Sequence, residues 1–173
     1  MRIQTVTTAE FFTLPEDNGQ RVELVDGALV VSPCAGGRHQ RLVTRLVIDL
    51  DQAVPGEFEV LVGVNVKLNA QRVVIPDAVV TNAPGHDALY YDAADMAVVV
   101  EVMSPSSRSF DKAHKMALFA EARIPFYLLV DPAVRPAAAT LYRLVGSDYA
   151  PVAISSDGWL RSTEPFPIDL KLD

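Results

Sequence analysis

The alternation of apolar and polar residues divides the first third of the chain into helical segments and a hairpin. Residues 5–14 have the pattern of a short amphipathic helix. Two apolar runs, residues 21–25 and 28–32, flank Asp26-Gly27, a dipeptide that is the strongest short sequence signal for a β-hairpin. Leucine and valine then recur at helical spacing over residues 38–53, so the pattern predicts a helix there.

Mostly apolar runs in the middle of the chain predict a β-sheet. They cover residues 58–68, 73–81, 97–103 and 126–130. Between the last two runs, apolar residues at helical spacing predict a second long helix, which Ser107 or Ser109 can cap. Residues 140–168 predict two or three further short strands, with a turn at Asp157-Gly158.

The order of these elements predicts an α/β (α+β) fold in which helices flank a mixed β-sheet. The hairpin precedes this arrangement, and the C-terminal strands extend it. With 173 residues, half of them apolar, the chain is long enough to bury a substantial core. We therefore expect a single domain over residues 1–173, with a core at about 20–132 and a β extension at about 133–173.

Two acidic residues interrupt the apolar runs and indicate a functional site. Asp77 lies within residues 73–80, and Glu101 lies within residues 98–103. Burying an unpaired carboxylate is so costly that such a residue normally has a cationic partner, a bound metal or a cleft. Two of them on neighbouring strands suggest a shared cation, and a ligand set made only of oxygens suits Mg²⁺ or Mn²⁺.

A purely structural role is the alternative for either acid. A carboxylate at the end of a strand can be solvated, and one inside the fold can pair with an arginine. Asp131 illustrates an ordinary role, because it also follows an apolar run but precedes a proline, where a turn is a sufficient explanation.

Pro76-Asp77, followed by a glutamate in an apolar strand, resembles the motif of the PD-(D/E)xK nucleases. Glu101-Val102-Met103 takes the place of the second half of that motif, with Met103 where the nucleases have a lysine. Residues 101 and 103 of a strand share one face, so Met103 occupies the position of the lysine without supplying its charge.

Six stretches together resemble the Uma-two family of restriction-endonuclease-like bacterial proteins, over about residues 7–145. They are V-E-L-V-D-G at 22–27, R-H-Q at 38–40, I-P-D at 75–77, V-E-V-M-S-P-S at 100–106, D-K-A-H-K at 111–115 and Y-L-L-V-D-P at 127–132. The resemblance implies a restriction-endonuclease-like core that hydrolyses DNA with a divalent metal, Mg²⁺ or Mn²⁺, held by Asp77 and Glu101. It also implies that the lysine has moved to the following helix, where it is Lys115.

The spacing around Lys115 permits this role and leaves two alternatives. Lys115 borders the apolar face of its predicted helix, so a long side chain there can reach back to Glu101. Lys112 borders the same face and is a rival candidate. Asp111 and Lys115 are four residues apart, so a surface ion pair between them is the other interpretation.

His39 and Glu23 are candidate supporting residues. His39 continues the apolar face of the helix at 38–53 toward its N-terminus, so we expect it to point inward. There it would contact a phosphate or a water molecule, or serve as a core or capping histidine. Glu23 faces opposite to Val22 and Leu24, and it is either a third acid of the site or an exposed hairpin residue.

Charge and composition limit the partners and the compartment. A net charge of -7 argues against nucleic-acid binding over the whole surface, so DNA must meet a local basic face. Arg38, Arg41 and Arg45 form such a stripe on a predicted helix, a pattern that a solvated helix face shares.

No apolar run is long enough to span a membrane, residues 1–10 lack the pattern of a signal peptide, and the single Cys34 fits a reducing compartment. We therefore expect a cytoplasmic protein with no membrane partner.

Three hypotheses fit the sequence. In the first, the chain is a metal-dependent endonuclease in which Asp77 and Glu101 hold the metal, Lys115 stabilises the developing charge, and Glu23 and His39 support the site. In the second, the chain is a catalytically silent nuclease-like module that binds or regulates a partner. The acidic composition and the absence of the strand lysine favour this hypothesis. In the third, the two carboxylates act without metal, as in glycosidases. The sequence leaves a homodimer open.

Overall fold

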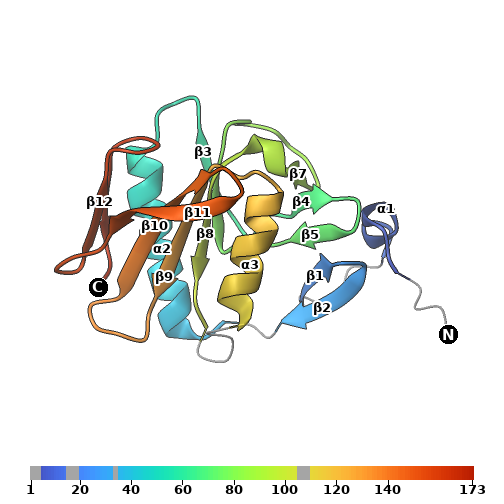
Figure 1. The fold of residues 1–173 in the computed structure, drawn as a ribbon, viewed down its shortest axis with the longest axis horizontal. Helices are drawn as coiled ribbons and strands as arrows, with labels where there is room; N and C mark the ends of the chain where they lie inside the picture. The colour runs from blue at the N-terminus through green and yellow to red at the C-terminus, as the bar shows by residue number, and fades with distance from the viewer. Residues whose placement is uncertain (1–4, 15–19, 33–34, 105–109) are drawn as a thin grey trace.

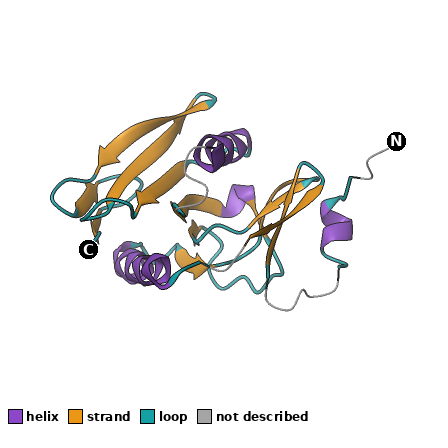
Figure 2. Cartoon of the chain, turned by 90° about the horizontal axis from the view of Figure 1, so that it is seen from below, coloured by secondary structure: helices purple, strands orange, loops and turns teal. Residues whose placement is uncertain are grey.

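The computed structural model describes residues 5–14, 20–32, 35–104 and 110–173, and the elements below lie within these ranges. The strands of the described chain form two large β-sheets and a two-stranded ribbon (Figure 1). Helices α2 (Gly37–Ala53) and α3 (Phe110–Glu121) pack on opposite sides of the larger sheet (Figure 2). The predicted α/β (α+β) fold, with a mixed sheet flanked by helices, is therefore confirmed.

The larger sheet has six strands and lies at the centre of the molecule. In spatial order they are β11 (Asp148–Ile154), β10 (Ala138–Val145), β9 (Phe126–Asp131), β8 (Met96–Val102), β6 (Ala78–Thr81) and β3 (Glu59–Val62). β8 and β9 are parallel, and the other neighbouring pairs are antiparallel. Parallel strands need a crossover connection, and here α3 supplies it between β8 and β9.

The second sheet has five strands and begins with the predicted hairpin. In spatial order they are β2 (Ala28–Ser32), β1 (Arg21–Val25), β5 (Arg72–Val74), β4 (Val66–Asn69) and β7 (Tyr91–Asp92), and a 3₁₀ helix (Ala93–Asp95) connects β7 to β8. At the hairpin turn, Asp26 and Gly27 both have positive φ, 51° and 79°, as a tight two-residue turn requires. A Cβ atom on Gly27 would lie 2.6 Å from Cβ of Thr5, so only glycine fits this position.

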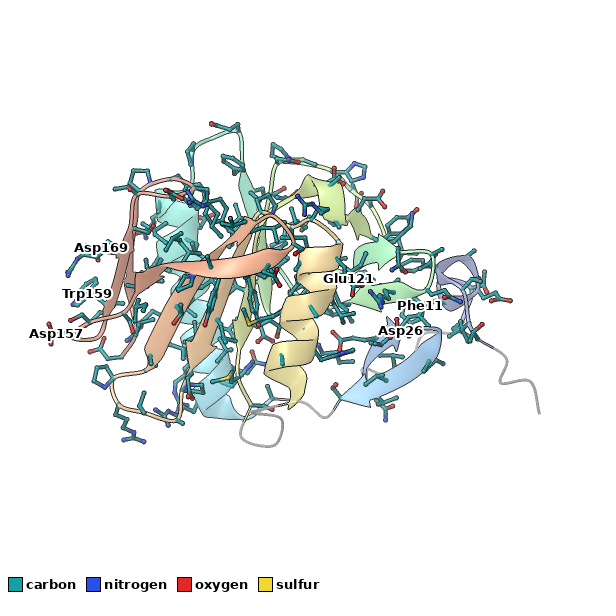
Figure 3. All side chains as sticks on the ribbon, viewed as in Figure 1. Phe11, Asp26, Glu121, Asp157, Trp159 and Asp169 are labelled. Atoms are coloured by element: carbon teal, nitrogen blue, oxygen red, sulfur yellow. The ribbon has the colours of Figure 1, made fainter. Side chains whose placement is uncertain are left out.

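Arg72 of β5 ties the hairpin to the helix α3. Its guanidinium group donates to Asp26 at the hairpin turn and to Glu121 at the end of α3. Both acids are labelled in Figure 3, where they lie on neighbouring parts of the structure. This link holds the five-stranded sheet against the helix that covers the central sheet.

Alternate residues of β8 divide the hydrophobic core into two parts. Val98 and Val100 pack on the side of α2, together with Leu46 of that helix. Val99 packs on the side of α3 and the second sheet, together with Phe119. Because side chains alternate along a strand, Glu101, two residues after Val99, also faces α3.

Helix α1 (Thr8–Phe11) is shorter than the helix predicted over residues 5–14. Thr7 is its N-cap and forms a reciprocal capping box with Glu10. The Thr8 amide donates to the carbonyl oxygen of Ala70 at 2.9 Å, in the turn between β4 and β5. A helix of four residues is held by such cap and tertiary contacts, because isolated turns of this length are unstable in water.

Two predicted strands are each divided in the structure. The run at 58–68 forms β3 and β4, which belong to different sheets, with Gly63 at a positive φ of 64° between them. The run at 73–81 forms β5 and β6, with residues 75–77 crossing between the sheets. Pro76 has no N–H to offer a sheet, and the Ile75 N–H donates to a side chain of β1 instead of to a neighbouring strand.

The C-terminal region has three strands over residues 140–168, the upper number predicted, and a fourth strand begins at residue 168. β10 and β11 extend the central sheet, and β12 (Trp159–Ser162) pairs with β13 (Ile168–Lys171) in the separate ribbon. The ribbon packs its apolar residues against α2, so it completes the core on that side. The predicted turn at Asp157-Gly158 is confirmed, because both residues have positive φ, 51° and 79°.

The orientation of α2 can be tested with two substitutions on this helix. Leu46 is fully buried, so Leu46→Ala should lower the free energy of unfolding by about 2–5 kcal/mol. Ile48 on the same helix is 51% exposed, so Ile48→Ala should change it by no more than about 0.5 kcal/mol. Urea denaturation of both variants measures the difference, and equal losses would contradict the orientation described for α2.

Candidate functional site

Asp77 and Glu101 face one another across two antiparallel strands. Ala78 of β6 pairs with Val100 of β8, so the register places the next residues, Asp77 and Glu101, opposite each other. Asp77 lies just before β6 rather than inside a strand, which corrects the position expected from sequence. Both residues are only 8% exposed, so this strand end is not solvated. Two carboxylates so placed repel one another and therefore require cations or protons nearby.

Asp77 is surrounded by hydrogen-bond donors from three elements. Its Oδ1 accepts from Nη1 of Arg21 in β1 at 3.0 Å. Its Oδ2 accepts from the backbone N–H of Val102 at 2.8 Å and lies 3.1 Å from Nε2 of His39 in α2. His39 Nε2 is also 2.9 Å from the Val102 carbonyl oxygen. Because both neighbours of Nε2 are acceptors, this nitrogen carries a proton and donates.

Glu101 pairs with the lysine of the following helix. Nζ of Lys115 in α3 lies 2.6 Å from Oε1 of Glu101 and 3.8 Å from Oε1 of Glu23. The helix α3 packs on the face of β8 that carries Glu101, which explains how the side chain reaches it. Lys115 is thus directed to the buried acids, as its place beside the apolar face of the helix permits, and its catalytic role stays a prediction. The side chains of Asp111 and Lys112 lie outside the described residues, so the rival lysine and the Asp111 ion pair remain untested.

Glu23 is buried at the junction of the two sheets. It is only 5% exposed, so the interpretation as an exposed hairpin residue is wrong. Its Oε1 accepts from the N–H of Ile75 at 2.8 Å and lies 3.8 Å from Nη2 of Arg21. Glu23 therefore accepts a hydrogen bond from the backbone N–H of Ile75, where the chain leaves β5. It also places a third carboxylate beside Lys115.

Arg21 belongs to the cluster, although it was not among the candidate residues selected from the sequence. It contacts both Asp77 and Glu23. Arg21 and Glu23 are two residues apart in β1, so their side chains share a face of the strand. That spacing was the available signal, since a buried acid in a strand needs a cationic neighbour.

Burial and the neighbouring charges shift the pKa values of these groups in opposite directions. Burial raises the pKa of Glu101 from 4.5 to about 7, and the negative charge of Asp77 adds to this effect against the opposing charge of Lys115. Burial also raises the pKa of Asp77, but the hydrogen bonds from His39 and the Val102 N–H, together with the positive charges of His39 and Arg21, outweigh it and lower the pKa overall. The hydrogen bond to Asp77 raises the pKa of His39 above its usual 6.5.

Two buried side-chain nitrogens in the described ranges have no hydrogen-bond partner, and both belong to residues that contact Asp77. They are Nε of Arg21 and Nδ1 of His39. With Nε2 already protonated and the pKa of the ring raised, Nδ1 carries a proton in the imidazolium form, and Arg21 Nε always does. Buried donors are normally satisfied, so these two suit an acceptor such as a phosphate oxygen or a water molecule.

The chemistry of the donor atoms fits a hard divalent cation. Asp77 and Glu101 offer carboxylate oxygens, and Mg²⁺ is commonly held by one or two carboxylates while keeping water and phosphate ligands. Within the described residues, no three His, Cys, Asp or Glu side chains are arranged to hold a metal. An all-protein cage is therefore absent from this part of the chain, and a two-carboxylate site is the arrangement that the donors allow. Arg21 and Lys115 now contact those oxygens and would have to release them.

The fold is shared with a solved bacterial structure. A crystal structure from Anabaena variabilis, described as "a putative nuclease belonging to DUF820", superimposes with a TM-score of 0.72 at 16% sequence identity. The alignment covers 92% of this chain and 89% of that one, and at such low identity it shows the common fold. The profile of the Uma2 family, described as "Putative restriction endonuclease", matches residues 8–173, and the chain belongs to this family.

Other comparisons add little to this assignment. No functionally curated protein matches the chain. Neither the family match nor the structural match supports a homodimer. None of the helices in the described part of the chain is long and apolar enough to cross a membrane.

The raised pKa values predict how stability depends on pH in the metal-free protein. Glu101 and His39 bind a proton more tightly in the folded state, so each contributes stability that is complete below its unfolded pKa and is lost as pH rises through its folded pKa. We expect Tm to fall between about pH 5 and pH 8, and to fall less in Glu101→Gln, which cannot titrate. Thermal unfolding at several pH values measures both slopes, and equal slopes would contradict a pKa near 7 for Glu101.

Proposed function

We propose that the chain is a metal-dependent endonuclease that hydrolyses DNA phosphodiester bonds. The observation that carries this proposal is the pair of buried carboxylates, Asp77 and Glu101, held face to face with Lys115 at 2.6 Å from one of them. Membership of the Uma2 family, whose description names a restriction endonuclease, supports the same reaction class and DNA as substrate. Mg²⁺ is the proposed cofactor, with Mn²⁺ as the substitute.

Asp77 and Glu101 would hold the divalent cation. When bound, such an ion polarises a phosphoryl oxygen and lowers the pKa of a water molecule. Lys115 would release Glu101 to the cation and donate a hydrogen bond where negative charge develops on the scissile phosphate, or orient the attacking water. The free N–H groups of Arg21 and His39 would bind phosphate oxygens. Glu23 would keep Lys115 in place once Glu101 is engaged.

Replacing the lysine should reduce the rate without removing the fold. We expect Lys115→Met to lower the cleavage rate about 10²- to 10³-fold, because a preorganised donor to the developing charge is lost. Lys67→Met is the matched control, since Lys67 pairs with Asp92 at the surface of the second sheet, 3.2 Å away. Cleavage of a plasmid or labelled oligonucleotide with Mg²⁺ or Mn²⁺ measures both variants, with circular dichroism as the test of folding.

The metal requirement is tested in the same assay. Asp77→Asn should abolish cleavage, and EDTA should abolish cleavage by the wild type, because both remove the proposed cation from the site. Cleavage that persists in EDTA, or that survives both Asp77→Asn and Lys115→Met, would refute the proposed mechanism.

A non-catalytic module is the second candidate, and the charge balance of the cluster favours it. Three basic side chains, those of Arg21, His39 and Lys115, already contact the three acids, so the site is neutral without a metal when all six are charged. Calorimetric titration with Mn²⁺ distinguishes the two candidates. Binding that is lost in Asp77→Asn supports the nuclease, whereas no binding by the folded wild type supports the silent module.

A further inference from the structure

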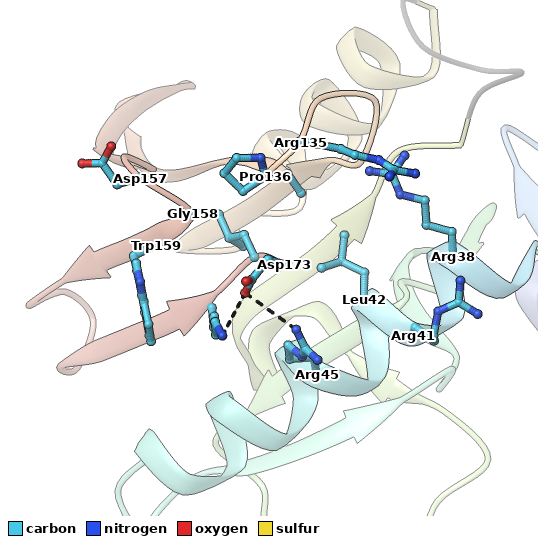
Figure 4. A pocket seen from close by; sticks show the side chains of 13 residues that line it. Arg38, Arg41, Leu42, Arg45, Arg135, Pro136, Asp157, Gly158, Trp159 and Asp173 are labelled. Atoms are coloured by element: carbon cyan, nitrogen blue, oxygen red, sulfur yellow. Dashed lines mark ion pairs between the residues drawn. The ribbon is translucent and has the colours of Figure 1, made fainter.

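An arginine-lined pocket opens beside the N-terminal half of α2, and none of its lining residues belongs to the acid cluster. Its volume is about 560 Å³, and α2 forms one wall. The loop after β9 and the β12–β13 ribbon form the other walls, as Figure 4 shows. Its basic lining residues are Arg38, Arg41, Arg45, Arg135 and Lys171.

The charge of this pocket is opposite to that of the whole chain. Five basic and two acidic side chains line it, a net charge of +3, whereas the chain carries a net charge of -7. One of the acids, Asp173, is held between Lys171 at 3.3 Å and Arg45 at 3.7 Å (Figure 4). A third of the 15 lysines and arginines therefore gather at one opening, and such a local field attracts anions.

The pocket and the acid cluster share the first turn of α2. His39 contacts Asp77, and its neighbour Arg38 lines the pocket, where it donates to the carbonyl oxygen of Val134 at 3.2 Å. From Arg38 to Arg45 the helix rises about 10 Å. Phosphates follow one another along each DNA strand at about 3.4 Å of helix axis, so this row spans roughly three nucleotides.

We propose that this pocket binds the phosphate backbone of DNA beside the point of cleavage. The inference rests on the proposed nuclease function and assigns the surface that holds the substrate strand beyond the scissile phosphate. A row of guanidinium groups leading away from His39 fits a chain of phosphates better than a single anion. Trp159 lines the same pocket and is half-buried, so its fluorescence should respond to a DNA strand bound there.

Equilibrium binding in EDTA tests the proposal without cleavage. The probe is a fluorescein-labelled double-stranded oligonucleotide. The variant carries both Arg41→Gln and Arg45→Gln. The loss of two phosphate contacts should reduce the slope of log K against log salt by about 1.8 and weaken binding about 10- to 100-fold near 0.1 M salt. Because Trp159 is the only tryptophan, its fluorescence should change on addition of unlabelled DNA in the wild type and change less in the variant.

A matched control separates the pocket from the overall charge. Arg143→Gln with Lys67→Gln also removes two positive charges, and both residues pair with surface acids away from the pocket. Arg143 resembles Arg45 in having a side chain that is 47% exposed and in one ion pair. This control variant should bind the labelled DNA with nearly the wild-type affinity.

Two results would overturn the inference. One is equal affinity and equal salt slope for the pocket variant and the control. The other is competition by inorganic phosphate as strong as that by DNA at the same phosphate concentration, which would indicate a site for isolated anions. Absence of cleavage with intact, pocket-dependent DNA binding would instead count against the nuclease mechanism alone.

Discussion

The antiparallel register of β6 and β8 is the constraint on which the rest of the site depends. It sets two carboxylates against each other in a part of the fold that excludes water, where neither could remain charged alone. Each basic residue of the cluster can be understood as a response to this repulsion. Lys115 approaches from the face of α3, His39 from the end of α2 and Arg21 from the neighbouring sheet. The site is therefore a place where three packing interfaces meet.

Helix α2 joins the hydrophobic core to the polar chemistry. Leu46 anchors it to the central sheet, and this packing fixes the direction in which the side chains of its first turns point. His39 is thereby held against Asp77, while the arginines on another face are directed into the pocket. One amphipathic helix thus provides stability, a contact to the acids and a basic surface on an acidic protein.

Much of the fold could be predicted from the sequence because its signals are local. The Asp26-Gly27 turn and the helical spacing over 38–53 each depend on a few adjacent residues. The divided strands could not be predicted in the same way, because a continuous apolar run does not show that its two halves pair in different sheets. At the site, the two acids were conspicuous in apolar surroundings. Arg21 was not, because its role depends on the long-range pairing of β1 with β5.

The crossing of the chain at Ile75-Pro76-Asp77 has a consequence for when chemistry becomes possible. Glu23 belongs to one sheet, whereas Asp77 precedes β6 and Glu101 lies near the end of β8 in the other. A chain in which only one sheet has formed brings together only some of these residues, because the cluster needs side chains from both sheets. Completion of the acid cluster therefore depends on the docking of both sheets, so a change that separates the sheets would also separate Glu23 from Asp77 and Glu101.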